Sequence, residues 1–178
     1  GINTLANAVK STMGPKGKLV LIQKPGFHPI VTKDGVTVAN SINLPDEVEN
    51  LGVKVIKEAA SRTAEEAGDG TTTSTVLAQA IYNEGIKMKA AGYQVDKLKN
   101  GVESALQVAK KYLEEIKKEI SSKEELQQVA LISANGEKEI ADLIVDAIKS
   151  SGIDGSVIVE QAKGFKSNLT IVDGYNIN

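Results

Sequence analysis

Cysteine is absent from this 178-residue chain, and histidine occurs once, at His28. The missing thiols exclude disulfide bonds, thiolate nucleophiles and zinc–thiolate sites. A single imidazole with no cysteine or second histidine cannot build a recognisable metal site or a Ser/His catalytic arrangement. We therefore interpret His28, which lies between Phe27 and Pro29, as a structural residue.

Aromatic residues and arginine are almost as scarce. The chain has no Trp, two Phe and four Tyr, so Val, Ile, Leu and Ala must fill the interior, which favours helix-rich packing. Arg62 is the single arginine, and 21 basic residues nearly balance 23 acidic ones. No arginine-rich stripe or base-stacking platform is present, so we expect no binding to nucleic acid.

Long hydrophobic runs are missing as well. The sequence contains no apolar stretch of about 18 residues, and its first residues lack the charged start and apolar core of a secretion signal. The apolar fraction of 41% and the charged fraction of 25% are ordinary for a globular protein. These features predict a soluble, cytoplasmic protein without membrane contact.

The first part of the chain predicts a helix followed by two short strands. Ile2, Leu5 and Val9 recur at helical spacing up to a break at Gly14 and Pro15. No N-cap residue precedes this helix, so we expect the chain to begin inside a longer element. Strands are predicted at residues 19–22 and 30–32, where β-branched and apolar residues cluster between glycine and proline.

Asp34 and Gly35 follow the second of these strands and permit two interpretations. An Asp-Gly pair can form a tight hairpin turn that leads into residues 36–38. Alternatively, Asp34 can cap the N-terminus of a short helix. Local chemistry alone does not decide between them.

Three longer helices are expected to form the core, over residues 45–68, 71–92 and 95–120. Each has apolar residues at spacings of three and four and is bounded by glycine, proline or acidic residues. The apolar face of the first helix is predicted to consist of Val48, Leu51, Val55 and Ala59.

A smaller mixed α/β extension is expected from residue 121 onward. Ser121 with Glu124, or Ser122 with Glu125, forms a capping-box pattern for a short helix, and another helix is predicted over 137–150. Strand-like runs at 157–159 and 169–172 follow. The predicted fold class is therefore mainly α with small β elements (α+β).

The segment from Gly68 to Thr75 combines glycine, one carboxylate and a run of hydroxyl side chains between two predicted helices. A helix N-terminus presents free N–H groups and partial positive charge, which suits phosphate oxygens. Asp69 could hold a magnesium ion that bridges those phosphates. The simpler explanation is helix termination and capping, but the hydroxyl-bearing residues here exceed what capping needs.

Two further segments are candidates for the same chemistry. Gly14 to Lys18 is rich in glycine and lysine but lacks P-loop spacing, so by itself it is typical of a turn. Lys33 and Asp34 could meet a phosphate and orient an attacking water, respectively. Taken alone, that pair is also typical of a turn.

Together these segments resemble the group I chaperonins of bacteria and organelles, the GroEL family. The matching motifs occur in the family's order and with similar spacing, and Met13 stands where the family usually has leucine. They are Thr12-Met13-Gly14-Pro15-Lys16-Gly17, Thr32-Lys33-Asp34-Gly35, Ala67-Gly68-Asp69-Gly70-Thr71-Thr72-Thr73 and Ile132-Ser133-Ala134-Asn135.

The resemblance implies an architecture and a set of site residues. Residues 1–120 would be part of an equatorial nucleotide-binding domain, a helical bundle, and residues 121–178 part of an intermediate domain that ends at the apical hinge. Asp34 would position the attacking water, Asp69 would coordinate Mg²⁺, and Asp34-Gly35 would open a short helix. The ATP contacts would be Thr12, Met13, Gly14, Pro15, Lys33, Asp69, Gly70, Thr71, Thr72 and Thr73, with Ile132 and Ser133 near the adenine.

The resemblance also implies an ATP-dependent folding chaperone that uses Mg²⁺, with K⁺ as a possible second cation. Its partners would be unfolded client proteins, a co-chaperonin and further subunits of a ring, in the cytoplasm of a bacterial or phage-infected cell or in an organellar matrix. The family's second catalytic aspartate would lie beyond Asn178, so we expect little or no hydrolysis from this chain alone. The alternatives are a non-catalytic chain that binds nucleotide or joins a chaperonin ring, and a helical domain whose loops bind nothing.

Overall fold

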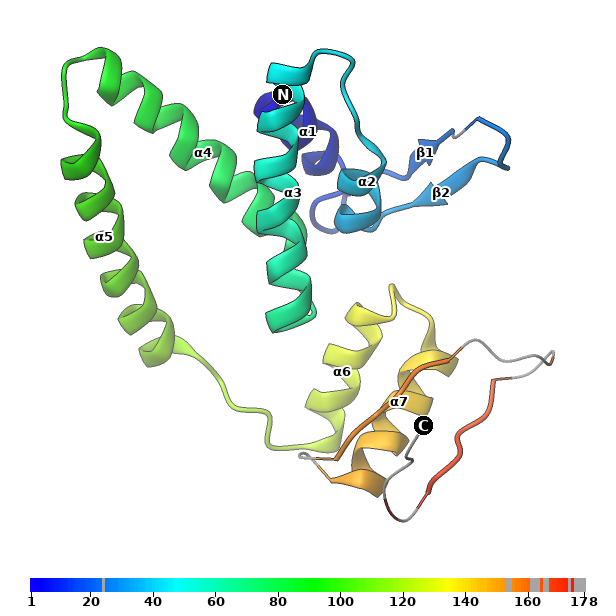
Figure 1. Cartoon of the computed structure of the whole chain (residues 1–178). Helices are drawn as coiled ribbons and strands as arrows, with labels where there is room; N and C mark the ends of the chain where they lie inside the picture. Colours follow the sequence, from blue (N-terminus) through cyan, green and yellow to red (C-terminus); the bar gives the residue numbers. More distant parts are fainter. Residues whose placement is uncertain (24, 153–154, 161–163, 165–166, 173, 175–178) are drawn as a thin grey trace. The chain divides into compact units, whose positions relative to one another are not determined.

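The computed structural model describes residues 1–23, 25–152, 155–160, 164, 167–172 and 174 (Figure 1). The chain forms two compact units, Gly1–Lys111 and Tyr112–Asn178, and each is described by itself below. Helix predominates, and the strands in the described part of the chain form one two-stranded sheet. The predicted mainly α fold is confirmed. The domain boundary expected at residues 120/121 stays a prediction.

The first unit contains five helices and a β-hairpin, with the last helix continuing into the second unit. The strands pair antiparallel, with Leu21 opposite Val31. Figure 1 shows this hairpin projecting beyond α2. The bounds of the elements are α1 Ile2–Lys10, β1 Val20–Ile22, β2 Ile30–Thr32, α2 Gly35–Ser41, α3 Glu47–Ala67, α4 Thr71–Ala90 and α5 Val95–Ile116.

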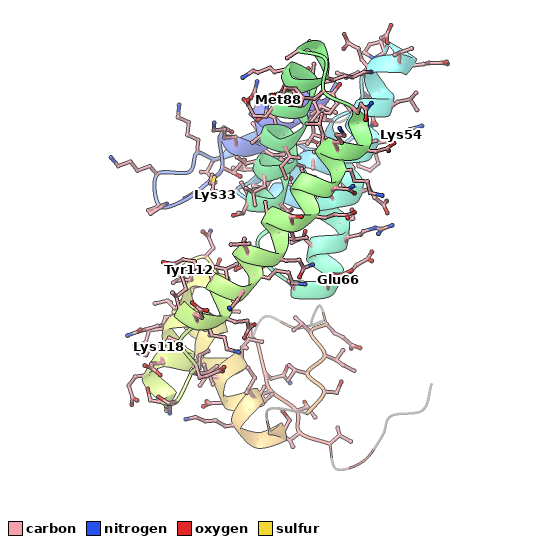
Figure 2. The ribbon with its side chains drawn as sticks, turned by 90° about the vertical axis from the view of Figure 1, so that its left-hand side faces the viewer. Lys33, Lys54, Glu66, Met88, Tyr112 and Lys118 are labelled. Atoms are coloured by element: carbon pink, nitrogen blue, oxygen red, sulfur yellow. The ribbon has the colours of Figure 1, made fainter. Side chains whose placement is uncertain are left out.

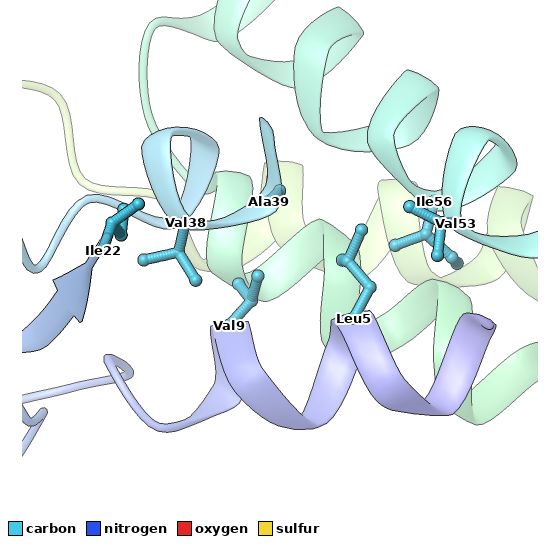
Figure 3. Close-up of a cluster of buried hydrophobic side chains, with 7 residues drawn as sticks. All are labelled: Leu5, Val9, Ile22, Val38, Ala39, Val53 and Ile56. Carbon is cyan, nitrogen blue, oxygen red and sulfur yellow. The ribbon is translucent and has the colours of Figure 1, made fainter. Parts of the chain in front are cut away.

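The core of the first unit lies where α1, α2, α3 and β1 meet (Figure 3). Leu5 and Val9 of α1 are fully buried, as the helical spacing predicts. They pack in one cluster with Ile22, Val38, Ala39, Val53 and Ile56. Burying a Val, Leu or Ile side chain contributes roughly 1.5–3 kcal/mol, so this cluster stabilises the packing of α1, α2, α3 and β1 against one another.

Helix α3 ends where the sequence predicts, but it buries a different face from the predicted one. Gly68 terminates it with a left-handed backbone, φ 70°, which glycine adopts without steric cost. The predicted apolar face is wrong, because its residues Val48, Leu51 and Val55 are 77%, 58% and 63% exposed. The buried stripe consists of Val53, Ile56 and Ala60.

The close approach of the N-terminus of α1 selects this stripe of α3. A side chain at Gly52 would lie 3.1 Å from both the amide nitrogen and Cγ1 of Ile2. A Cβ atom at Gly1 would lie 1.7 Å from the carbonyl oxygen of Glu49. Glycine at these two positions therefore lets α1 pack against the Val53 side of α3, which periodicity alone did not indicate.

Helix α5 is also not the core helix that its amphipathic pattern predicted. It has no buried residue and ends at Ile116, four residues before the expected end. Figure 2 labels Tyr112 near its C-terminal end, where the side chain is 60% exposed. Helical spacing indicates that one side of α5 is apolar, but burial requires a packing partner. Among the described residues, no side chain of α5 is fully buried by such a partner.

The second unit contains α6, Lys123–Ser133, and α7, Lys138–Ser151. These helices pack through a small cluster of Ala130, Ala141 and Val145. The predicted strands at 157–159 and 169–172 are wrong, since neither run forms a strand in the described part of the chain. A strand depends on ladder hydrogen bonds to a neighbour, and no described residue pairs with these runs.

The N-terminus of α6 resolves the capping-box alternatives in favour of Ser122 with Glu125. Ser122 Oγ accepts from the Glu125 amide at 3.1 Å, and Glu125 Oε2 accepts from the amide and hydroxyl of Ser121 at 2.9 and 3.1 Å. Lys118, labelled in Figure 2, donates to Oε1 of the same carboxylate. The hydrogen bond from Lys118, followed by those from Ser121, lowers the pKa of Glu125 to about 2.

Candidate nucleotide-binding site

A pocket of about 360 Å³ opens in the first unit where three sequence-distant loops meet. One loop follows α1, one joins β2 to α2, and one joins α3 to α4. The lining therefore brings together residues from all three predicted motifs. These residues are Thr12, Met13, Gly14, Lys33, Asp34, Gly35, Asp69, Gly70, Thr71, Thr72 and Thr73.

The N-terminus of α4 gives the pocket its anion-binding character. Gly70 occupies the N-cap position with φ 83° and supplies no side-chain cap. The amides of Thr71, Thr72 and Thr73 have no hydrogen-bond partner among the described residues. Free amides at the N-terminus of a 20-residue helix carry partial positive charge and point toward a bound anion. This end of α4 suits phosphate oxygens.

The hydroxyl run of α4 divides into two groups. Ser74 Oγ and Thr75 Oγ1 donate back to the carbonyl of Thr71, at 2.9 and 2.8 Å, so these hydroxyls are used within the helix. The hydroxyls of Thr71, Thr72 and Thr73 make no hydrogen bond to a described residue. They remain available as additional donors to a ligand in the pocket.

Asp69 provides an exposed carboxylate beside these donors. Its Oδ1 accepts from the amide of Gly70 at 2.6 Å. Within the described ranges, no group of three or more His, Asp or Glu side chains could hold a metal ion by itself. A cation at Asp69 would therefore take its remaining ligands from water and phosphate, which fits the preference of Mg²⁺ for oxygen ligands and retained waters.

Asp34 is the second carboxylate of the pocket and the N-cap of α2. Its Oδ2 accepts from the amide of Thr37 at 2.7 Å and from the Thr37 hydroxyl at 2.5 Å. No described residue hydrogen-bonds Oδ1. The helix interpretation of Asp34-Gly35 is thus confirmed, and the hairpin-turn alternative is wrong.

Gly35 joins the two helix ends through a close contact that the motif did not reveal. An added Cβ atom would lie 2.4 Å from Thr72 Oγ1 and 3.3 Å from Thr71 Oγ1. Gly35 is buried and lines the pocket beside Asp34. The only signal in the sequence was its place in the Thr32–Gly35 motif, and that signal did not indicate which residue it would contact.

The loop after α1 forms the third wall. Thr12 is buried, and its hydroxyl donates to the carbonyl of Val9 at 2.8 Å. Gly14 turns the chain with φ 73°, and the amide of Gly17 donates to its carbonyl at 2.9 Å. Pro15 lies in the exposed part of this turn and is not among the lining residues. Its predicted nucleotide contact stays a prediction.

Lys33 adds a cation to the lining of this pocket. It is exposed at the end of β2 (Figure 2) and forms no salt bridge within the described residues. Ile132 and Ser133 lie on α6 of the second unit, with Ile132 78% exposed. Their expected place near the adenine stays a prediction.

The comparisons with known proteins decide the family. The family model of the TCP-1/cpn60 chaperonin family matches residues 5–178. The chain belongs to this family. The resemblance seen in the motifs is therefore confirmed at the level of the chaperonin family.

Solved chaperonins share this fold. The chaperonin gp146 from the bacteriophage EL 2 (Pseudomonas aeruginosa), crystallised in the presence of ATP-BeFx, is 37% identical with a TM-score of 0.68 in crystal form II, covering 82% of this chain and 26% of that one. In crystal form I the same protein is 36% identical with a TM-score of 0.69, and the match covers 84% of this chain and 26% of that one. A group III chaperonin in the open state is 27% identical with a TM-score of 0.68, and the match covers 84% of this chain and 30% of that one. This chaperonin chain thus spans between a quarter and a third of the length of the structures that it matches.

Among the described helices of this chaperonin chain, none combines the length and apolar character that a membrane-spanning segment requires.

Proposed function

We propose that this chain forms the phosphate-binding part of the ATP site of a chaperonin subunit, and that the complete protein uses ATP hydrolysis to drive protein folding. The convergence of three loops on the uncapped N-terminus of α4 carries this proposal. That arrangement supplies free amides, hydroxyls, one lysine and two carboxylates within one pocket. Phosphoryl transfer depends on such positioning and charge neutralisation.

Each group has a proposed role in holding Mg-ATP. The free amides of Thr71, Thr72 and Thr73 would donate to phosphate oxygens, and Lys33 would neutralise part of their charge. Asp69 would hold Mg²⁺ together with phosphate and water oxygens, and the ion would supply charge neutralisation during hydrolysis. The loop of Thr12 to Pro15 would contact the nucleotide from the α1 side.

Asp34 is proposed to position the attacking water. Its Oδ1 would accept a hydrogen bond from the water while the water oxygen forms a bond to the γ-phosphorus. The bond from that phosphorus to the bridging oxygen breaks, the electron pair leaves with ADP, and the proton of the water passes by way of the carboxylate to the released phosphate. A residue in this role contributes typically 10²–10⁴-fold to the rate.

The motifs further support the proposal that the protein is a group I chaperonin. In that case Ile132 and Ser133 would lie on the adenine side of the nucleotide, and K⁺ would be a possible second cation. ATP binding would tilt the intermediate segment and switch a ring between states, which requires a different affinity for each state. Client proteins, a co-chaperonin and neighbouring subunits are the proposed partners of the complete protein, in a cytoplasmic or organellar interior.

The test compares Asp69→Asn and Asp34→Asn with Glu66→Gln, an exposed carboxylate of α3 outside the pocket lining (Figure 2). Asparagine retains the hydrogen bond at residue 69 and the helix cap at residue 34. In the full-length protein, we expect Asp69→Asn to weaken Mg-ATP binding by about tenfold or more, since a charged metal ligand is lost. Asp34→Asn should leave binding intact and lower hydrolysis by about 10²-fold or more.

Glu66→Gln should change neither the affinity for Mg-ATP nor the rate of hydrolysis. Wild-type binding and hydrolysis in both pocket variants would contradict the proposal. Binding without hydrolysis in the wild-type protein would instead support the non-catalytic, nucleotide-binding alternative.

A further inference from the structure

Thr37 makes two hydrogen bonds to one oxygen of the proposed catalytic carboxylate. It lies in the first turn of α2, and both its amide and its hydroxyl donate to Asp34 Oδ2, at 2.7 and 2.5 Å. Thr37 belongs to none of the motifs that point to nucleotide binding and does not line the pocket. Among the described residues, its hydroxyl hydrogen-bonds to this carboxylate alone.

Capping of α2 accounts for only one of these bonds. An N-cap carboxylate needs a single bond from the amide three residues later, and the Thr37 amide supplies it. The hydroxyl adds a charge-assisted bond, which is roughly twice as strong as a neutral one. Two donors to the same oxygen also restrict rotation of the carboxylate about its last torsion, which is otherwise broad.

The consequence concerns which carboxylate oxygen can take part in chemistry. Oδ2 is occupied by two donors, while Oδ1 has no partner among the described residues, and Asp34 lines the pocket. We propose that Thr37 is a positioning residue that fixes the Asp34 carboxylate so that Oδ1 accepts the hydrogen bond from the attacking water. This inference rests on the proposed role of Asp34.

A matched set of variants separates positioning from simple support of the fold. Thr37→Val keeps the side-chain shape and the backbone cap but removes the hydroxyl. Thr37→Ser restores the hydroxyl. Ser41→Ala is the control, because it removes a hydroxyl from the same helix. Within the described part of the chain, that hydroxyl bonds only to the carbonyl of Val38, at 2.7 Å.

The variants are measured in the full-length protein by ATP hydrolysis under steady-state and single-turnover conditions, with Mg-ATP affinity and thermal unfolding alongside. Thr37→Val should lower kcat about tenfold, since one charge-assisted hydrogen bond is lost. KM and the dissociation constant of Mg-ATP should stay within about twofold, because Oδ2 takes no part in binding phosphate. Thr37→Ser and Ser41→Ala should retain the wild-type kcat.

The outcomes distinguish this inference from the proposed function. If Asp34→Asn abolishes hydrolysis while Thr37→Val keeps the wild-type kcat, Thr37 is only part of the helix cap and the inference is overturned alone. Equal losses in kcat and Mg-ATP affinity for Thr37→Val, or no recovery in Thr37→Ser, also overturn it. If the wild-type protein does not hydrolyse ATP, or if Asp34→Asn is fully active, the proposed function fails and the inference fails with it.

Discussion

Replacing Gly35 by alanine would test the contact through which α2 shapes the N-terminus of α4. The new methyl group would lie 2.4 Å from Thr72 Oγ1, well inside an ordinary van der Waals separation of roughly 3.5 Å. The Thr72 hydroxyl would have to rotate away, because the backbone of both helices is held by buried packing. One hydrogen bond to a phosphate group, worth about 1.5–3 kcal/mol, would then be lost.

This loss corresponds to Mg-ATP binding weaker by roughly 10- to 100-fold, measurable by isothermal titration calorimetry. The decisive assay is a double-mutant cycle with Thr72→Ala, which removes the hydroxyl and hence the clash. Gly35→Ala should weaken binding strongly in the wild-type background and hardly at all in the Thr72→Ala background. Additive effects of the two substitutions, or wild-type affinity of Gly35→Ala, would show that the contact between residue 35 and Thr72 does not shape the phosphate site.

Two further predictions concern stability. In urea unfolding, Ile56→Ala should lower the free energy of unfolding by about 2–5 kcal/mol, because Ile56 is 2% exposed in the core. The control Val48→Ala, on the exposed side of the same helix, should change it by less than about 0.5 kcal/mol. Glu125 has a pKa lowered to about 2 from a normal 4.5, so its contribution to the α6 N-terminus should be complete above pH 4.5 and disappear as the pH falls to 2. Hydrogen exchange of the first α6 amides should show this loss in the wild-type protein and not in Glu125→Gln. Unchanged protection across that range would contradict it.

The sequence indicated most helix ends because local chemistry determines them. Gly68 ends α3 with a left-handed backbone, and Ser122, one of the two predicted alternatives, caps α6. These signals act over three or four residues, so no tertiary information is needed to find them. The three loop motifs were likewise visible, and the structure brings their residues into one pocket.

The sequence did not indicate which apolar surfaces become buried. Helix α3 has two apolar stripes, and the approach of α1 at Gly52 selects the one that contains Val53 and Ile56. Helix α5 has the periodicity of a core helix but buries nothing. Burial depends on packing partners that are distant in the sequence, and periodicity within one helix contains no information about them.

The contacts that refine the site were also beyond sequence reasoning. The packing of Gly35 on Thr72 joins residues 37 positions apart in the chain, and the second hydrogen bond from Thr37 to Asp34 depends on a side-chain rotamer. Neither can be derived from a motif, because a motif specifies residue types and spacing but not the orientation of their atoms.

The most direct test of the nucleotide site is a titration of the 178-residue chain with Mg-ATP, followed by the amide resonances in two-dimensional NMR. We expect saturable shifts concentrated at Thr71, Thr72 and Thr73, with smaller shifts at Gly14 and Gly35, and the loss of these shifts in Asp69→Asn. Shifts that are absent at millimolar Mg-ATP, or that appear elsewhere on α4 while these amides stay unchanged, would contradict it.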